Sequence, residues 1–425
     1  MTPSPSGRPR PWWRALAPAA ALVLAALCLR APFSAVGPVL GELGTELSVS
    51  GAALSVLPAL PLVCFGLVSP AAPALAARLG VQRAVLAGLV ALAAGITLRA
   101  AGTWGLYAGT VLLTAGIAVA NVLVPAAARA EYGDRSAAVV GAAVASMGFS
   151  ASLGAGLAQP LATAAGSAIA GLTLWVAPVL VAGTAMALLG RRRSPAAGPP
   201  ASRLPVVTVL RDRVALAVTA FFGLQSLSFY VMLTWLADVL EDDAGTSPVT
   251  AGGLVAAAAA FGAPCALVVP PLAARARSQV AWVAGATLLS TVGIVGLLLA
   301  PTTAPAVWAV LWGLGTGTAF PLAMTLVLVR TRDVAQTGRL SAAAQSVGYL
   351  LAATGPLAVG LLHDATGGWR AGLVVLLVLQ ALQLTAGVAA GRPGLVTETP
   401  AGGGQPPAEA PGSLGRDGRA GRRAG

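Results

Sequence analysis

Long apolar segments recur along this chain, and they constrain its fold more than any other feature. Each is about 20 residues long, which is enough for a helix to cross a hydrocarbon core about 30 Å thick. Only 9% of the 425 residues are charged, whereas soluble domains carry about 25%. The sequence therefore predicts an all-α polytopic membrane protein with twelve transmembrane helices, over 15–37, 51–73, 82–101, 104–128, 136–158, 167–190, 212–238, 249–272, 278–300, 304–329, 337–361 and 369–390.

Positive charge is concentrated in short segments between alternate spans. The formal net charge of +12 is carried by arginines, and this placement follows the positive-inside rule for membrane proteins. We therefore expect a lipid membrane and no nucleic acid as the partner, and both termini in the cytoplasm. The arginines that define this side include Arg14, Arg78, Arg83, Arg129, Arg135, the run at 191–193, Arg275, Arg277, Arg330, Arg332 and Arg339, whereas Glu42, Glu46, Glu241, Asp242 and Asp243 lie in the opposite loops.

A basic, proline-rich segment after the sixth span divides the chain into two similar halves. "PALAAR" returns as "PPLAAR", "SMGF" as "SVGY" and "PVLGE" as "DVLED", each about 200 residues later. Parallel repeats of six spans are typical of secondary transporters with a substrate site near the bilayer midplane between the halves. The predicted organisation is a cytoplasmic segment over 1–14, six-helix bundles over 15–190 and 212–391, a cytoplasmic linker over 191–211 and a disordered cytoplasmic tail over 392–425.

Arg30 lies deep inside the first predicted span, in the stretch "LCLRAPFSAVGPVL". At 1.5 Å per residue it is about 24 Å from Arg14 and about 18 Å from Glu42, so its guanidinium reaches neither surface easily. Because an arginine at this depth is costly, it normally faces the bundle interior or a wet cavity. We predict that Arg30 binds substrate in a central cavity, with a structural pairing or packing role as the alternative. Pro32 and Pro38 are expected to bend or break this helix.

Few other polar side chains lie at membrane depth. The repeat offset places Tyr230 at the position of Arg30, so the two are predicted to face each other across the pseudo-twofold axis. Amide and hydroxyl groups at this depth either contact a ligand or form hydrogen bonds between helices. The predicted substrate-binding set is Arg30, Asn121, Gln225, Tyr230, Gln345 and Tyr349.

The sequence offers no set of residues for catalysis, metal binding or ATP hydrolysis. Cys28, Cys64 and Cys265 fall within apolar spans and are predicted to be small core residues. The single histidine, His363, precedes Asp364; this pair is predicted to cap or fix a loop, with proton coupling as the alternative. No Asp or Glu lies deep in a predicted span, and no phosphate-binding lysine motif occurs. We expect neither an enzyme nor a cofactor or metal, and leave a coupling ion open.

Six segments carry a more specific signal: "LRAPFSAVGPVL", "VLPALPLVCFGLVSPAAP", "GIAVANVLVPA", "FFGLQSLSFYVMLTWL", "GTAFPLAMTL" and "QSVGYLLAATGPLAVGLLHDATG". Together they resemble the bacterial cyanate permease and 2-nitroimidazole transporter family, a branch of the major facilitator superfamily. The resemblance extends from about residue 20 to residue 391. It implies a monomeric twelve-helix secondary transporter of the bacterial inner membrane, whose helices 1, 4, 7 and 10 line the central cavity.

One departure from the superfamily pattern lies between the second and third predicted spans. There the superfamily usually has "GxLADRxGRR", whereas this chain reads "PALAARLGVQR". Arg78, Gly80 and Arg83 are kept, and the resemblance implies that they form a gating loop. Ala77 stands where the aspartate is expected, so the sequence does not support a gating interaction carried by that carboxylate.

These observations predict a secondary active or facilitated transporter of a small anion or compact polar organic solute, cyanate-like or nitroimidazole-like, working by alternating access. Arg30 suits both solutes, because a nitro group presents two coplanar oxygens that a guanidinium can meet with two donors. The alternative is a multidrug-type exporter of apolar compounds, for which Arg30 is structural. A membrane sensor or scaffold that transports nothing is a third possibility.

Overall fold

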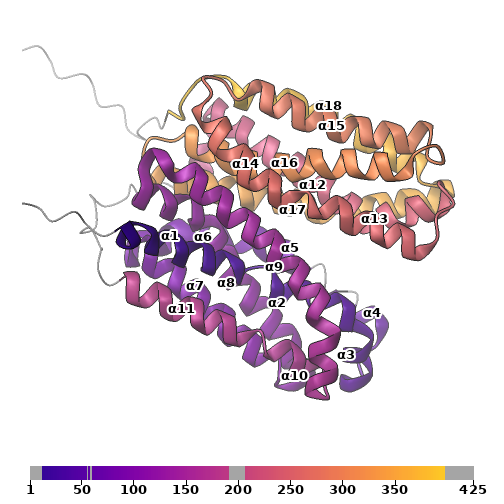
Figure 1. The fold of residues 1–425 in the computed structure, drawn as a ribbon, viewed down its shortest axis with the longest axis horizontal. Helices are drawn as coiled ribbons and strands as arrows, with labels where there is room; N and C mark the ends of the chain where they lie inside the picture. Colours follow the sequence, from indigo (N-terminus) through magenta and orange to yellow (C-terminus); the bar gives the residue numbers. More distant parts are fainter. Residues whose placement is uncertain (1–11, 55, 58–59, 191–205, 398–425) are drawn as a thin grey trace, which may run out of the picture.

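The computed structural model describes residues 12–54, 56–57, 60–190 and 206–397 as two bundles of helices (Figure 1). The described residues contain no strand. The first bundle comprises α1 (Trp12–Leu27), α2 (Ala31–Ser34), η1 (Gly37–Val39), α3 (Leu40–Leu47), α4 (Gly51–Leu54), α5 (Leu60–Val68), α6 (Ala71–Leu79), α7 (Val81–Leu98), α8 (Gly102–Tyr132), η2 (Gly133–Arg135), α9 (Ser136–Ala165), α10 (Ala168–Thr173) and α11 (Val176–Gly190). The second comprises η3 (Val206–Arg211), α12 (Arg213–Asp242), α13 (Pro248–Ala260), α14 (Gly262–Arg275), α15 (Val280–Leu299), α16 (Pro305–Val329), α17 (Val334–Thr366) and α18 (Arg370–Gly391).

The number of membrane crossings depends on how the longest helical stretch is counted. Among the described residues, 10 stretches are long and apolar enough to cross, or up to 11 if the bent pair α5 and α6 is one span. One of them, Gly102–Ala165, is 64 residues long and contains both α8 and α9. Each of these two helices is about 45 Å long, which exceeds a hydrocarbon core of about 30 Å. If α8 and α9 cross separately, the described helices supply the twelve predicted crossings.

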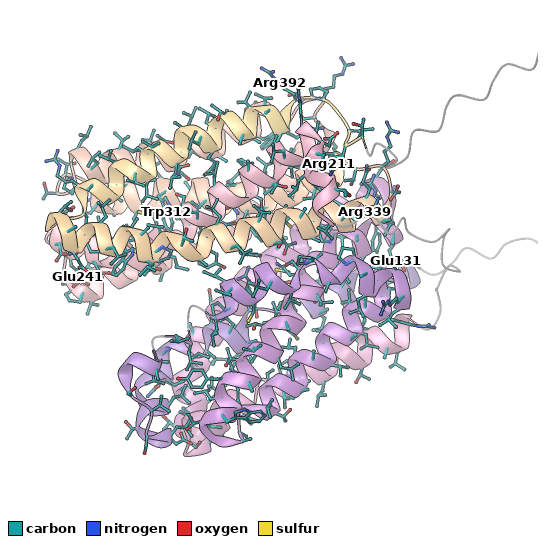
Figure 2. The ribbon with its side chains drawn as sticks, turned by 180° about the vertical axis from the view of Figure 1, so that it is seen from behind. Glu131, Arg211, Glu241, Trp312, Arg339 and Arg392 are labelled. Atoms are coloured by element: carbon teal, nitrogen blue, oxygen red, sulfur yellow. The ribbon has the colours of Figure 1, made fainter. Side chains whose placement is uncertain are left out.

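The two bundles meet at one end and diverge toward the other (Figure 1). In Figure 2 the end at which they meet carries Glu131 of α8 and Arg339 of α17, and Arg211 and Arg392 lie toward the same end. Glu241 of α12 lies at the opposite end. The arginine-rich segments of the sequence therefore gather where the bundles are in contact.

The first crossing is broken near its middle, which distinguishes it from its counterpart in the second bundle. α1 ends at Leu27 and α2 begins at Ala31. Pro32 and Pro38 both lack a backbone N–H, so two hydrogen bonds of a regular helix cannot form in this part of the crossing. The counterpart α12 contains no proline and runs unbroken from Arg213 to Asp242. The expected break is confirmed, and it occurs in one repeat only.

The predicted end of this span at residue 37 is wrong, because helical structure continues through α3. Glu42 and Glu46 therefore lie in a helix and not in a loop. Glu46 Oε2 accepts hydrogen bonds from the backbone N–H groups of Ala168 (2.9 Å) and Ile169 (3.4 Å) at the start of α10. Because the first amides of a helix lack partners within the helix, this carboxylate stabilises α10 and fixes α3 against it.

The second crossing differs from the predicted single span over 51–73. α5 and α6 are inclined by 54° to each other at a break between Val68 and Ala71, and α6 extends to Leu79. Pro70 lies at this break, where its missing N–H interrupts the hydrogen-bond ladder. The other predicted spans each overlap one or two of the observed helices.

The domain boundaries stay predictions. Segments 1–11, 191–205 and 398–425, which hold most of the predicted N-terminal segment, linker and tail, lie outside the described residues. The beginning of the predicted tail is described: Val396 O accepts a hydrogen bond from Gln336 Nε2 (3.0 Å), and Thr397 N donates to Asp212 Oδ2 (2.9 Å). The residues directly after α18 are therefore held against the second bundle.

Glycines allow α7 and α8 to approach each other closely. A Cβ atom added at Gly116 of α8 would overlap Gly88 O of α7 and lie 2.7 Å from Leu92 N. Both neighbours are backbone atoms, so a side chain here would require the two helices to separate. Gly148 of α9 is different, because a Cβ atom added there meets nothing within 4 Å.

We expect Gly116→Ala to lower the apparent unfolding temperature of the purified protein by about 1–3 °C, because overpacking costs about 1–3 kcal/mol and a chain of this length shifts by about 1 °C per kcal/mol. Gly148→Ala is the matched control and should leave it within about 0.5 °C. Thermal unfolding in detergent, followed by tryptophan fluorescence, measures both. Equal unfolding temperatures for the two variants would contradict the close approach of α7 and α8.

Candidate functional site

Arg30 lies at the break in the first crossing, as the residue directly before α2. The break is fixed from outside by α9: Ser150 Oγ accepts a hydrogen bond from Ala31 N (2.9 Å), and Ser34 Oγ donates to Ala151 O (2.8 Å). Arg30 O accepts from Phe33 N and Ser34 N, so its backbone already belongs to α2. The position of α2 therefore determines where the Arg30 side chain is directed.

The Arg30 guanidinium contacts two tyrosines of the opposite bundle. Its Nη1 donates to Tyr230 Oη at 3.4 Å, and the side chain also interacts with the Tyr349 hydroxyl. The two tyrosine rings are 6.5 Å apart between centroids. Among the described residues, no carboxylate pairs with Arg30. Since a guanidinium has five N–H donors, this cation keeps donors for an electron-rich ligand.

Asn121 and Gln345 form a second polar link between the bundles. Asn121 Nδ2 donates to Gln345 Oε1 (2.8 Å) and to Tyr349 Oη (3.4 Å), and Gln345 Nε2 donates to Ser341 Oγ (2.9 Å). Asn121, Ser341, Gln345 and Tyr349 are buried, whereas Arg30 and Tyr230 are partly exposed. We refer to Arg30, Asn121, Tyr230, Gln345 and Tyr349 as the central polar cluster.

Aromatic rings surround this cluster. Phe65 and Phe222 pack on Tyr349 with centroid distances of 5.2 and 5.4 Å, and Phe229 packs on Tyr230 at 5.3 Å. Apolar surroundings of this kind lower the local dielectric constant and strengthen interactions with a charge. The rings also fix the directions of the two phenol groups that contact Arg30.

Some residues predicted for the site lie elsewhere. Gln225 is buried and donates to the neighbouring Ser226 Oγ (2.7 Å), and the hydrogen bonds of the described residues do not join it to the central polar cluster. Arg78 and Arg83 of the predicted gating loop are exposed. Gly80 has φ = +83° and links α6 to α7, a conformation that favours glycine.

His363 does not pair with Asp364, which is exposed. Its ring stacks on Trp369, with centroids 3.9 Å apart. Nearby, burial and the adjacent Asp242 raise the pKa of Asp243 above its ordinary value, while Arg370 and His363 oppose that shift. This group lies at the end of the second bundle that carries Glu241, away from the end at which the bundles meet (Figure 2).

Two arginines, Arg99 and Arg129, make contacts that the sequence does not predict. Arg99, at the end of α7, is 1% exposed and donates through Nη1 to Pro32 O at 2.8 Å. Arg129 of α8 donates to Leu328 O, Thr331 Oγ1 (3.3 Å) and Arg332 O (3.3 Å) at the end of α16, which joins the bundles. Arg99 falls only two residues from the end of the predicted span 82–101, so the depth argument applied to Arg30 does not single it out. For Arg129 the sequence signal is only its place in a basic segment.

Comparison with known proteins agrees with this architecture. The sequence model of the Major Facilitator Superfamily matches residues 22–356. An uncharacterized transporter of Bacillus subtilis (strain 168) is 34% identical over 87% of this chain and 92% of its own length. The 2-nitroimidazole transporter of Escherichia coli (strain K12) is 34% identical over 88% and 95%, and the cyanate transport protein CynX of the same organism is 28% identical over 82% and 90%.

Solved structures support the same fold. The proton:xylose symporter XylE matches 89% of this chain and 95% of its own, with a TM-score of 0.71 and 10% identity. The human organic anion transporter MFSD10 matches 89% and 100%, with a TM-score of 0.67 and 17% identity. The arrangement of two bundles, the extent of the family match and the similarity to the bacterial relatives lead to one conclusion: the chain belongs to the Major Facilitator Superfamily, in the group that includes the cyanate and 2-nitroimidazole transporters.

Proposed function

We propose that this protein is a secondary active or facilitated transporter that moves a small anion or a compact polar organic solute by alternating access between its two bundles. The observation that carries the proposal is Arg30, a guanidinium at the junction of the bundles whose protein contacts are two neutral phenols. A cation in a membrane interior is costly unless it is compensated. An anion, or a group with two electron-rich oxygens, provides that compensation and accepts two hydrogen bonds.

The arrangement of the bundles supports alternating access. The arginine-rich end, at which the bundles meet, is the cytoplasmic end by the positive-inside rule. The bundles diverge at the end that carries Glu241 (Figures 1 and 2), which corresponds to a conformation open to the outside. Both termini are then cytoplasmic. The central polar cluster joins the two bundles and is the point about which one bundle rocks against the other.

Relatives of this chain are named for 2-nitroimidazole and for cyanate, and both solutes have the chemistry that Arg30 selects. Of the aromatic rings around the cluster, Phe229 and Tyr230 are partly exposed. They favour a planar solute, which can stack on Phe or Tyr. The same rings would also suit an apolar drug. The second candidate function is therefore that of a multidrug-type exporter.

The test is uptake of labelled cyanate and of labelled 2-nitroimidazole into proteoliposomes that contain the full chain, with protein-free liposomes as the control. We expect saturable uptake of at least one solute, inhibited by an excess of the same unlabelled solute. If neither solute is taken up and the same vesicles transport an apolar dye, the exporter function replaces the proposed one.

A further inference from the structure

A backbone carbonyl beside Arg30 has lost its partner within the helix. In a regular helix Pro32 O would accept from Val36 N, four residues later. Here Val36 N bonds to Phe33 O (3.2 Å) instead. Such a group needs a partner at membrane depth, because no water is present in the hydrocarbon to supply one. Arg99 supplies it, by donating through Nη1 to Pro32 O at 2.8 Å.

The Nε atom and the aliphatic stem of Arg99 are both held by α8. Its Nε donates to Thr110 Oγ1 of α8 at 3.1 Å, and its stem lies against Gly109, where an added Cβ would be 3.0 Å from Arg99 Cγ. The residue is 1% exposed, and its Nη2 has no hydrogen-bond partner among the described residues. Arg99 thus connects the rigid α7–α8 pair directly to the break in the first crossing.

Together with the α9 contacts, this bond attaches α2 on two sides. Ser150 and Ala151 of α9 hold Ala31 and Ser34, and Arg99 holds Pro32 between them. Gly154 of α9 packs so closely on Ala31 that a Cβ atom there would lie 2.5 Å from Ala31 O. Since Arg30 directly precedes α2 and shares its hydrogen bonds, the orientation of α2 sets the direction of the Arg30 side chain.

We infer that Arg99 is a positioning residue: it fixes the broken turn of the first crossing so that the Arg30 guanidinium points between Tyr230 and Tyr349. This inference rests on the proposed function for its effect on transport, but not for its effect on the geometry of residue 30. Arg99 does not contact the tyrosines; it acts through Pro32. Its role differs from that of a buried arginine that only stabilises its own bundle.

Arg330 provides the matched comparison. It is also buried and also donates to backbone carbonyls, through Nε to Ala390 O (2.8 Å) and Nη2 to Gly391 O (3.0 Å). These carbonyls lie at the end of α18, away from the break in the first crossing. Replacing either arginine with glutamine removes one buried charge and at least one hydrogen bond to a backbone carbonyl, but only Arg99→Gln should affect residue 30.

The experiment measures the environment of residue 30 without a substrate. In the full chain with Cys28, Cys64 and Cys265 replaced by alanine, Arg30→Cys is labelled with a water-soluble maleimide in proteoliposomes. Adding Arg99→Gln should change the labelling rate at least threefold, whereas adding Arg330→Gln should change it less than threefold. Asp238→Cys, at an exposed site on α12, reports whether labelling changes globally. If Arg99→Gln fails to give a monodisperse protein, Thr110→Val replaces it, because it removes the bond to Arg99 Nε.

A transport measurement completes the test, with labelled cyanate and 2-nitroimidazole as the probes. For a probe that the intact protein transports, Arg99→Gln should raise KM at least tenfold and change kcat less than threefold. Arg99→Lys, which keeps the charge and N–H donors but not the planar guanidinium, should restore part of the loss. In the Arg30→Lys background, which is expected to keep residual transport, Arg99→Gln should raise KM less than it does in the intact protein.

Two results would overturn the inference: a labelling rate at residue 30 that Arg99→Gln changes less than threefold, or an unchanged KM in a protein that transports a probe. If the labelling rate changes but the intact protein transports neither probe, the positioning role is supported and the proposed function fails for these solutes. The two proposals are therefore tested separately.

Discussion

Arg30→Gln is expected to abolish uptake of an anionic or nitro-group solute while the protein stays folded. Glutamine keeps an amide that can still contact Tyr230, but it removes the positive charge and the paired donors of the guanidinium. Hydrogen bonds to a charged group contribute about 1.5–3 kcal/mol each, so the loss of two should weaken binding by at least about 100-fold. Initial rates of uptake of labelled cyanate and 2-nitroimidazole into proteoliposomes measure the effect.

Two further variants separate charge from geometry. Arg30→Lys keeps the charge but not the planar pair of donors, so we expect a raised KM and residual transport. Tyr230→Phe removes only the hydroxyl that accepts from Arg30 Nη1 at 3.4 Å, and its effect should be smaller, at most about tenfold. Gel filtration and thermal unfolding must show that each variant is folded. Transport by Arg30→Gln at the rate of the intact protein would mean that Arg30 is structural, and would favour the exporter of apolar compounds.

The central contacts of the site could be predicted because they depend on the repeat. Tyr230 occupies the position of Arg30 in the second half of the sequence, and the structure joins these two side chains. The helix break beside Arg30 follows from Pro32, a local signal. Asn121, Gln345 and Tyr349 were recognised as polar residues in apolar spans, and they are linked to one another.

Other contacts could not be predicted, because they depend on packing between segments far apart in the sequence. The hydrogen bond from Arg99 to Pro32 O joins residues that are 67 positions apart in the sequence. It forms only because the end of α7 packs beside the break in the first crossing, and no local sequence pattern predicts that packing. Gln225 looked equivalent to Gln345, yet its amide donates to the adjacent Ser226. The helical α3 was missed because Glu42 and Glu46 suggested a loop, whereas Glu46 is stabilised by the amides of α10.

Ala77 stands where the superfamily usually has an aspartate, and the contacts of Arg129 bear on the consequence of that difference. The sequence lacks the aspartate that the superfamily usually has in the loop between the second and third crossings, and Arg78 and Arg83 of that loop are exposed. Among the described residues, Arg129 makes a polar contact between the bundles at this end, because it donates to backbone oxygens at the end of α16. The end of a helix carries a partial negative charge, so an arginine there is favourable.

We therefore expect Arg129→Gln to shift the protein toward a conformation in which this end is open. Loss of a charged hydrogen-bond donor costs about 1.5–3 kcal/mol, which changes the ratio of closed to open molecules by about ten- to a hundredfold. Spin labels at Ala130 of α8 and Ala335 of α17, both exposed, report the separation of the bundles by pulsed electron paramagnetic resonance in nanodiscs. The variant should show a larger population at long distances.

Arg135→Gln is the matched control for this measurement. Arg135 lies in η2, is exposed and forms no hydrogen bond or ion pair among the described residues, so its replacement removes the same charge from the same end of the molecule without breaking a contact between the bundles. Its distance distribution should equal that of the intact protein. If Arg129→Gln gives that same distribution, Arg129 does not hold the bundles together. A shift in both variants would instead assign the effect to net charge at this surface. A shift in Arg129→Gln alone would show that the contact of Arg129 with the end of α16 keeps the two bundles together at this end.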